Sequence, residues 1–208
     1  MKLFGPKVTL ARFFCKFADM GKVTFRAATI VDVPLVAACV LAAVDLADLS
    51  QPVTEENTRE YAVAKRVCSR EDTLFSYRNA RIICCDGSPI GAIVSYDGAI
   101  YQHSREITFR VFREELGNNN ESYGVETQPG EYYLDSMAIF PEYRGKGIGL
   151  MAMQDSIDVA VSKGFHDVTL LVDSSAPQKE AYYARLGFRP IGRVQTFGAE
   201  FTKMLLSV

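Results

Sequence analysis

The sequence predicts an α/β protein built as one domain with strands and helices in alternation. From Tyr132 onward, apolar and glycine-rich segments follow in the order strand, glycine turn, helix, strand, helix, strand, which is the pattern of an α/β domain. A hydrophobic content of 48% with 23% charged residues is typical of a globular chain with a core. The 208 residues suit a single domain, alone or enlarged by an insertion.

The first 22 residues form an N-terminal arm that precedes a domain spanning residues 23–208. In this arm lysine and arginine alternate with apolar side chains, so we expect either a loosely attached packing helix or an upstream extension. The arm lacks the continuous apolar stretch and the small-residue cleavage site of a secretory signal. No run of about 20 apolar residues occurs in the chain, so we expect no transmembrane helix and no membrane partner.

The first elements of the domain are a strand and two helices. Val23 to Ala28 reads as a strand, and Asp32 with Pro34 marks the start of a helix from Leu35 to Leu46. The run Thr54 to Asn57 resembles the capped start of a second helix that continues to about Val67.

A hairpin and a third helix follow. Arg81–Cys85 and Ile90–Tyr96 are strand candidates on either side of Asp86-Gly87-Ser88-Pro89, a strong turn signal. Gln102 to Leu116 is glycine-poor with mixed charge and predicts a helix, which the run from Gly117 to Ser122 breaks. The sequence contains no internal repeat and no second domain boundary.

The most informative segment is a strand followed by the glycine-rich turn Arg144-Gly145-Lys146-Gly147-Ile148-Gly149. Glycines at alternate positions let the backbone approach a ligand closely, and a helix that begins here directs unpaired amides at that ligand. An anion, and above all a pyrophosphate, fits such a site. The spacing is neither that of a Rossmann turn nor that of a Walker A loop. The alternative is an ordinary tight turn in which Arg144 and Lys146 are solvated charges.

Beyond the turn, the pattern continues to the C-terminal part of the chain. Leu150 to Lys163 predicts an amphipathic helix that Gly164 ends, and Asp167 to Val172 is a β-rich apolar run. Gln178 to Arg185 predicts a short helix, and another strand begins at Phe188.

Two motifs in this order resemble the GCN5-related N-acetyltransferase (GNAT) superfamily. Arg144 to Gly149 is similar to its acetyl-CoA loop [RQ]-x-x-G-x-[GA], and Ala181 to Phe188 is similar to its xYxxLGF signature. Phe25 to Asp32 resembles the family's opening strand and first helix start, so the resemblance covers about residues 22–206. It implies a mixed, splayed central β-sheet flanked by helices, and transfer of an acetyl group from acetyl-CoA to a primary amine.

The resemblance also implies which residues bind the donor and which carry the chemistry. Backbone groups of Met137, Ala138 and Ile139 would bind the pantetheine arm like an added strand. The amides of Arg144, Gly145, Lys146, Gly147, Ile148 and Gly149 would hold the pyrophosphate. Tyr183 stands at the signature tyrosine and would protonate the leaving thiolate as general acid, since a phenol is protonated at neutral pH; the alternative is that Tyr183 only packs.

Asp135 is the candidate general base, because an acidic residue among apolar strand residues is unusual and is therefore expected to have a specific role. By period-two alternation it is expected to share a face with Tyr133, Met137 and Ile139, and Glu131 lies on the same face near the strand start. The other role open to Asp135 is accepting hydrogen bonds from neighbouring loop amides.

Two departures from the family pattern bear on function. Ala176 stands seven residues before Tyr183, where the family often has an asparagine that contacts the cofactor. The segment at about 97–130 is an apparent helical insertion. It is either a lid or wall over the acceptor site, or a packing or dimer-contact helix.

Three functional classes remain at this point: an acetyltransferase, a non-catalytic acyl-CoA-binding regulatory module of the same fold, and a phosphate-binding α/β protein of another family. The acceptor is a small-molecule or peptide amine that the sequence does not name, and a homodimer is consistent with the family.

Composition limits the remaining partners. A net charge of -2 gives no case for nucleic-acid binding. Five cysteines, an odd number, argue against a disulfide framework and for the cytoplasm. His103 and His166 lie far apart without cysteines at metal-ligand spacing, so no metal site is expected.

Overall fold

The computed structural model describes residues 21–51, 58–117 and 124–208, and in this part of the chain seven strands form one open sheet. Their order is β1-β2-β3-β4-β5-β7-β6, and every neighbouring pair is antiparallel except β4 and β5. The mixed α/β class predicted from the sequence is therefore confirmed. The strands are β1 (Val23–Ala27), β2 (Ala80–Cys85), β3 (Ser88–Asp97), β4 (Glu131–Ile139), β5 (Asp167–Asp173), β6 (Arg189–Thr196) and β7 (Ala199–Ser207).

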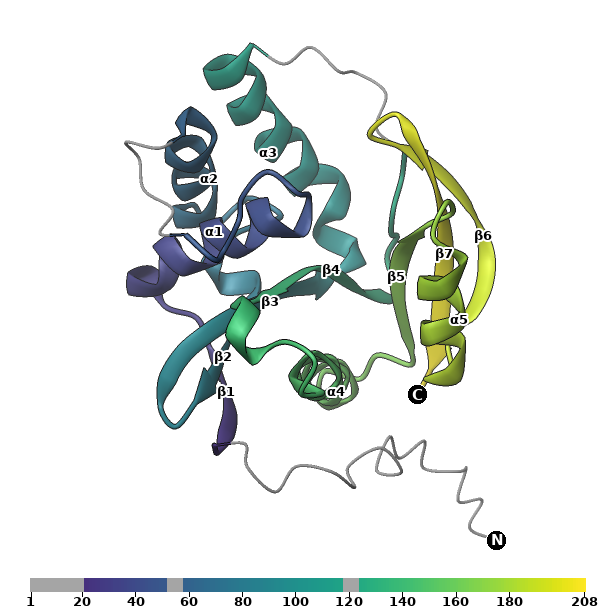
Figure 1. The fold of residues 1–208 in the computed structure, drawn as a ribbon. Helices are drawn as coiled ribbons and strands as arrows, with labels where there is room; N and C mark the ends of the chain where they lie inside the picture. The colour runs from purple at the N-terminus through teal and green to yellow at the C-terminus, as the bar shows by residue number, and fades with distance from the viewer. Residues whose placement is uncertain (1–20, 52–57, 118–123) are drawn as a thin grey trace, which may run out of the picture.

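Helices cover both faces of this sheet (Figure 1). Buried side chains of α1 and α2 form one hydrophobic cluster with β2 and β3, and those of α4 form others on the opposite face. The third helix, α3, packs beside α2 and lies in the connection between β3 and β4. The helices are α1 (Val33–Ala43), α2 (Arg59–Ser69), α3 (Tyr101–Leu116), α4 (Ile148–Ser162) and α5 (Pro177–Arg185). Within the described ranges, none of them has the length and apolarity needed to cross a membrane.

Most predicted elements are present, with shifted ends. The first helix ends at Ala43 and not at Leu46, and the helix after the glycine turn begins at Ile148, two residues earlier than expected. The predicted start at Thr54 to Asn57 lies outside the described residues; α2 begins at Arg59, where the Thr58 hydroxyl caps it. Residues 1–20 of the N-terminal arm also lie outside the described part.

Strands β4 and β5 separate after a short parallel contact. Only Glu131 to Tyr133 pair with Asp167 to Thr169. Beyond these residues, β5 remains paired along its length with β7, while the edge of β4 that faces β5 has no strand partner among the described residues. The central sheet is therefore splayed, and the gap between β4 and β5 is visible in Figure 1.

A β-bulge at Asp135 changes which side chains share a face of β4. Neighbouring residues of β3 pair with the residues before and after Asp135, which itself has no partner. Tyr133 and Ala138 consequently pack with the α1–α2 cluster, whereas Met137 and Ile139 pack toward α4. The prediction that Asp135, Tyr133, Met137 and Ile139 share one face is therefore wrong, because an inserted residue breaks the period of two.

Candidate functional site

A cavity of about 390 Å³ lies where β4 and β5 diverge. Asp135 and Met137 line it from β4, Leu171 from β5, and Tyr183 from α5. Phe197, at the tip of the hairpin that joins β6 and β7, closes another side and packs against an aromatic ring of α3. The cavity thus collects residues from segments that are far apart in the sequence.

Tyr183 is a half-buried side chain on this cavity. Its ring packs edge-on against Phe188, with centroids 5.9 Å apart, and against Tyr182 at 5.4 Å. Burial raises the pKa of Tyr183, and the neighbouring Tyr182 adds to the effect. Among the described residues its hydroxyl has no hydrogen-bond partner, so a protonated phenol is available to a ligand in the cavity.

Asp135 is held at the bulge by two hydroxyls. The Tyr96 hydroxyl donates to Oδ2 at 2.5 Å, and the Ser136 hydroxyl donates to Oδ1 at 2.7 Å. Burial raises the pKa of Asp135 above its ordinary value, although both hydrogen bonds act in the opposite direction. Asp135 is therefore fixed in place and holds its proton more tightly than an exposed aspartate does.

Glu126 is a second carboxyl group on the cavity, and the sequence reasoning missed it. Its side chain is 8% exposed and accepts a hydrogen bond of 2.9 Å from the Tyr133 hydroxyl. Burial and the charge of Asp135 raise the pKa of Glu126 to about 7. Hydrogen bonds from the Tyr133 and Tyr101 hydroxyls and the charge of Arg105 lower the pKa, but by less. No local pattern marks Glu126, because its partners lie on other elements.

Glu131, the other acid considered on β4, has a different role. Its Oε2 accepts from the Lys203 ammonium at 2.6 Å, from Thr127 at 2.9 Å and from Thr169 at 3.2 Å. Although burial alone would raise it, the pKa of Glu131 is lowered overall by these partners. Glu131 does not line the cavity, and its bonds join β4 to β5 and β7. Glu131 therefore forms an ion pair with Lys203 that ties these strands together.

The glycine turn has a backbone suited to an anion. Gly145 and Gly147 have φ angles of 74° and 77°, which favour glycine. The first backbone bond of α4 runs from the Met151 amide to the Gly147 carbonyl at 3.2 Å. Within the described residues, the amides from Gly145 to Leu150 find no backbone acceptor, so they and the positive end of the helix dipole are open to a ligand.

The side chains of the turn serve it in different ways. The Arg144 Nε donates to the Ile139 carbonyl at 2.7 Å, which fixes the end of β4 to the turn. The Lys146 ammonium is exposed and lies 5.4 Å from the ring centroid of Tyr143. Ile148 is buried, and a Cβ at Gly149 would lie 3.3 Å from the Met137 Cε, so α4 approaches β4 closely.

The free edge of β4 presents only part of the backbone predicted for it. The Phe140 amide donates to the Ile90 carbonyl of β3 at 2.9 Å. Because backbone groups alternate along an antiparallel strand, those of Ala138 also turn toward β3, and those of Met137 and Ile139 turn toward the gap. Ala138 is therefore not available as an added-strand partner, contrary to the prediction, and the Ile139 carbonyl is already bonded to Arg144.

Comparison with known proteins gives the family. A sequence model described as the acetyltransferase (GNAT) family matches residues 44–188, well over half of the chain. The chain belongs to the GNAT acetyltransferase family. This excludes the third functional class, a phosphate-binding protein of another family.

Relatives of this GNAT chain include one curated protein and many solved structures. N-alpha-acetyltransferase 30 of Schizosaccharomyces pombe is 36% identical over 56 residues, which are 27% of this chain and 37% of that protein. The matched segment therefore spans little more than a third of the length of that relative. An acetyltransferase crystal structure has a TM-score of 0.69 at 24% identity, covering 89% of this chain and 99% of the other. An N-acetyltransferase from Staphylococcus aureus Mu50 has a TM-score of 0.69 at 18% identity, covering 88% and 100%.

Some GNAT structures of this fold contain ligands. The PaiA N-acetyltransferase of Thermoplasma acidophilum, solved in complex with coenzyme A, has a TM-score of 0.52 at 14% identity, covering 90% of this chain and 99% of the other. The NatC complex bound to a Gag peptide and coenzyme A has a TM-score of 0.53 at 15% identity, covering 90% and 99%. In the described part of this chain, no group of His, Cys, Asp or Glu side chains is arranged to hold a metal ion.

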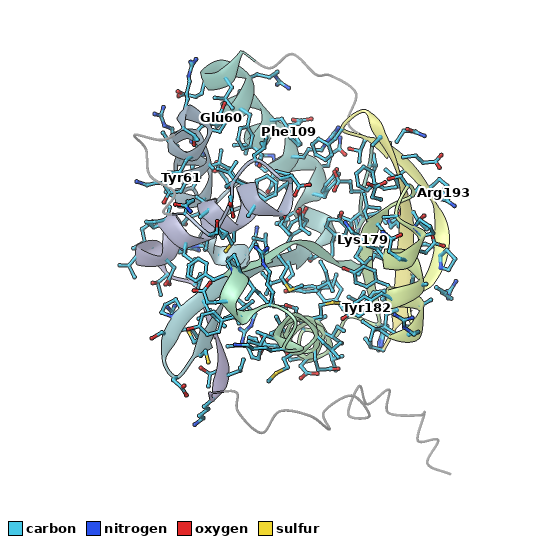
Figure 2. All side chains as sticks on the ribbon, in the orientation of Figure 1. Glu60, Tyr61, Phe109, Lys179, Tyr182 and Arg193 are labelled. Carbon is cyan, nitrogen blue, oxygen red and sulfur yellow. The ribbon has the colours of Figure 1, made fainter. Side chains whose placement is uncertain are left out.

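The position where many GNAT proteins have an asparagine is occupied by Ala176, which is buried at the start of α5. Its side chain offers no polar atom to a cofactor. Lys179, one turn further along α5, lines the cavity instead, and Figure 2 labels it together with Tyr182. Lys179 is a polar group of the site that the sequence reasoning did not single out.

Proposed function

We propose that this protein is an N-acetyltransferase that transfers an acetyl group from acetyl-CoA to a primary amine. One observation carries the proposal: a single cavity at the splay of β4 and β5 is lined by a protonated phenol, Tyr183, and by two carboxyl groups, those of Asp135 and Glu126. An acid and a base on one cavity are what proton transfer at an amine and a thiol requires.

The turn before α4 and the free edge of β4 fit acetyl-CoA. Unpaired amides from Gly145 to Leu150 suit the pyrophosphate, and the backbone groups of Met137 and the Ile139 amide suit the amides of pantetheine. Coenzyme A in PaiA and in NatC supports the same donor for this chain. When bound, acetyl-CoA supplies a thioester carbonyl for an amine to attack.

The residues of the cavity would then transfer protons and hold the donor and the acceptor in position. The acceptor amine must be neutral to attack, so a carboxylate takes a proton from its ammonium form. Tyr183 donates its phenolic proton to the sulfur as the C–S bond breaks. Holding donor and acceptor together in the cavity contributes up to about 7–11 kcal/mol to the barrier reduction in favourable cases.

The name of the fission-yeast relative supports a protein N-terminus as the first acceptor to test, and the NatC structure supports peptides in general. Small amines remain in the panel because the matched segment of the relative is short. A non-catalytic acyl-CoA-binding module is the second candidate, and the apolar Ala176 favours it, since a cofactor contact is missing there.

The test is thiol release from acetyl-CoA with N-terminal peptides, lysine peptides and polyamines. The Tyr183→Phe variant removes the proposed acid, and Tyr182→Phe is the matched control, since Tyr182 is 39% exposed. We expect kcat to fall by about 10²-fold in the first variant and to stay within about twofold in the control. Tight binding of acetyl-CoA with no thiol release from any acceptor would favour the module, and equal rates in all three proteins would remove Tyr183 from the mechanism.

A further inference from the structure

A carboxyl group from the connection between β3 and β4 completes the acidic end of the cavity. Glu126 belongs to that connection, Asp135 to β4 and Tyr183 to α5, and all three line the same cavity. A catalytic role for Glu126 rests on the proposed acetyltransferase activity.

One contact at Glu126 and two at Gly124, two residues earlier, hold this segment in place. The Tyr133 hydroxyl of β4 donates to its Oε2 at 2.9 Å. Two residues earlier, a Cβ on Gly124 would lie 2.4 Å from the Gln195 carbonyl oxygen, so this segment is pressed against β6. The Tyr101 hydroxyl of α3 donates to the Gly124 carbonyl at 3.1 Å. A side chain held this way has the fixed position that a catalytic group needs.

A buried hydroxyl on the same cavity independently indicates a polar occupant. Thr196, the last residue of β6, is 1% exposed and lines the cavity. Its Oγ1 has no hydrogen-bond partner among the described residues. Because a buried unpaired hydroxyl is destabilising by about 1–3 kcal/mol, a water molecule or a polar ligand atom is expected to occupy this part of the cavity.

The groups around Glu126 favour exchange of a proton near neutral pH. Asp135 and Tyr133 face it from β4, and Tyr101 and Arg105 face it from α3. Burial and the second carboxyl group oppose ionisation, while the hydroxyls and the guanidinium favour it, which leaves the pKa of Glu126 at about 7. Two neighbouring carboxyl groups that resist joint ionisation share a proton, so their titration belongs to the pair.

We propose that Glu126 is the general base of the reaction and takes a proton from the ammonium group of the acceptor, directly or through one water molecule. The amine that results attacks the thioester carbon, so that a C–N bond forms and the C–S bond breaks. Tyr183 gives its proton to the sulfur and is reprotonated by the second proton lost from the nitrogen. The proton held by Glu126 returns to solvent, and the balance is acetyl-CoA plus ammonium giving amide, thiol and one proton.

The test is the pH dependence of kcat/KM for thiol release in the wild type, Glu126→Gln and Tyr133→Phe. We expect the wild type to show an ascending limb near neutral pH, and the glutamine variant to lose that limb and about 10²-fold in rate. Tyr133→Phe removes a hydrogen bond that favours the ionised carboxylate. The ascending limb of the pH profile of this variant should therefore move to higher pH, while most of the plateau value of kcat/KM remains. Unchanged affinity of Glu126→Gln for coenzyme A shows that the fold is intact.

A second acceptor separates base catalysis from a structural role. An amine that is already neutral at the assay pH needs no first deprotonation, so the defect of Glu126→Gln should shrink to less than about tenfold with it. An equal defect with both amines, or an unchanged limb in Glu126→Gln, would overturn the assignment while leaving the transferase in place. A wild-type protein that releases no thiol with any amine would overturn the proposed function as well.

Discussion

Replacing Glu126 by glutamine should make the folded protein more stable at high pH relative to the wild type. The pKa of Glu126 rises from 4.5 to about 7 on folding, because the group is buried and faces Asp135. Below about pH 4.5 the carboxyl group is protonated in both states and there is no penalty. As the pH rises through 7, the unfolded chain ionises readily while the folded chain resists, so stability falls.

The magnitude follows from the two pKa values. Each pKa unit is worth about 1.4 kcal/mol, so the wild type loses about 3 kcal/mol of unfolding free energy through this group between about pH 4.5 and pH 8. Glutamine carries no charge and keeps an oxygen that can accept from Tyr133. The difference in unfolding free energy between Glu126→Gln and the wild type should therefore shift by about 3 kcal/mol in favour of the variant over this range.

Urea unfolding at intervals between pH 4.5 and pH 8 measures this difference. Titrating groups outside the Glu126–Asp135 pair cancel because both proteins share them, so the measured shift reports the pair. Glu131→Gln is the matched control. Glu131 is also buried, but its pKa is lowered and it is paired with Lys203, so the wild type should gain over that variant as the pH rises. A Glu126 difference that stays flat within about 0.5 kcal/mol would refute the assignment of a raised pKa to this residue.

Three further outcomes are expected. Asp32→Asn should lower stability at pH 7 by about 2 kcal/mol, because the pKa of Asp32 is lowered to about 2 by the Arg26 guanidinium; this loss should vanish in urea titrations as the pH falls from 3.8 to 2. Gly147→Val should weaken coenzyme A binding at least about tenfold by calorimetry, whereas Gly164→Val, strained alike at the other end of α4, should lose stability but keep the affinity. Lys203→Met leaves a buried carboxylate unpaired and should lower the free energy of unfolding by about 3–5 kcal/mol; a loss under 1 kcal/mol would show that the pair is unimportant.

The parts of the fold that depend on local chemistry were predictable from the sequence. The glycine turn is an example, since Gly145 and Gly147 have the positive φ angles that their spacing suggested. The short helix that carries Tyr183 is another, because Pro177 begins it and the chain turns at Gly187. These features are fixed by residues within a few positions of one another, so a pattern in the sequence reports them directly.

The parts of the fold that depend on tertiary contacts were not predictable from the sequence. Period-two alternation placed Asp135 on a face with Tyr133 and Met137, but the bulge, which forms only when β3 pairs with β4, moves them apart. Ala138 was expected at the free edge, and only the bond from Phe140 to β3 shows that its backbone turns away. Strand β7 was not predicted from the sequence, although it is the antiparallel partner of β5.

The acidic end of the cavity is a poor arrangement for stability alone. Glu126 is destabilising when ionised, and the hydroxyl of Thr196 is buried without a partner in the described chain. Leucine or glutamine in place of Glu126 would remove the burial of a charge beside Asp135. Local conflicts of this kind gather at functional sites, where the chemistry needs a group that packing alone would not select. The same residues that weaken this end of the fold are therefore those on which we expect proton transfer to depend.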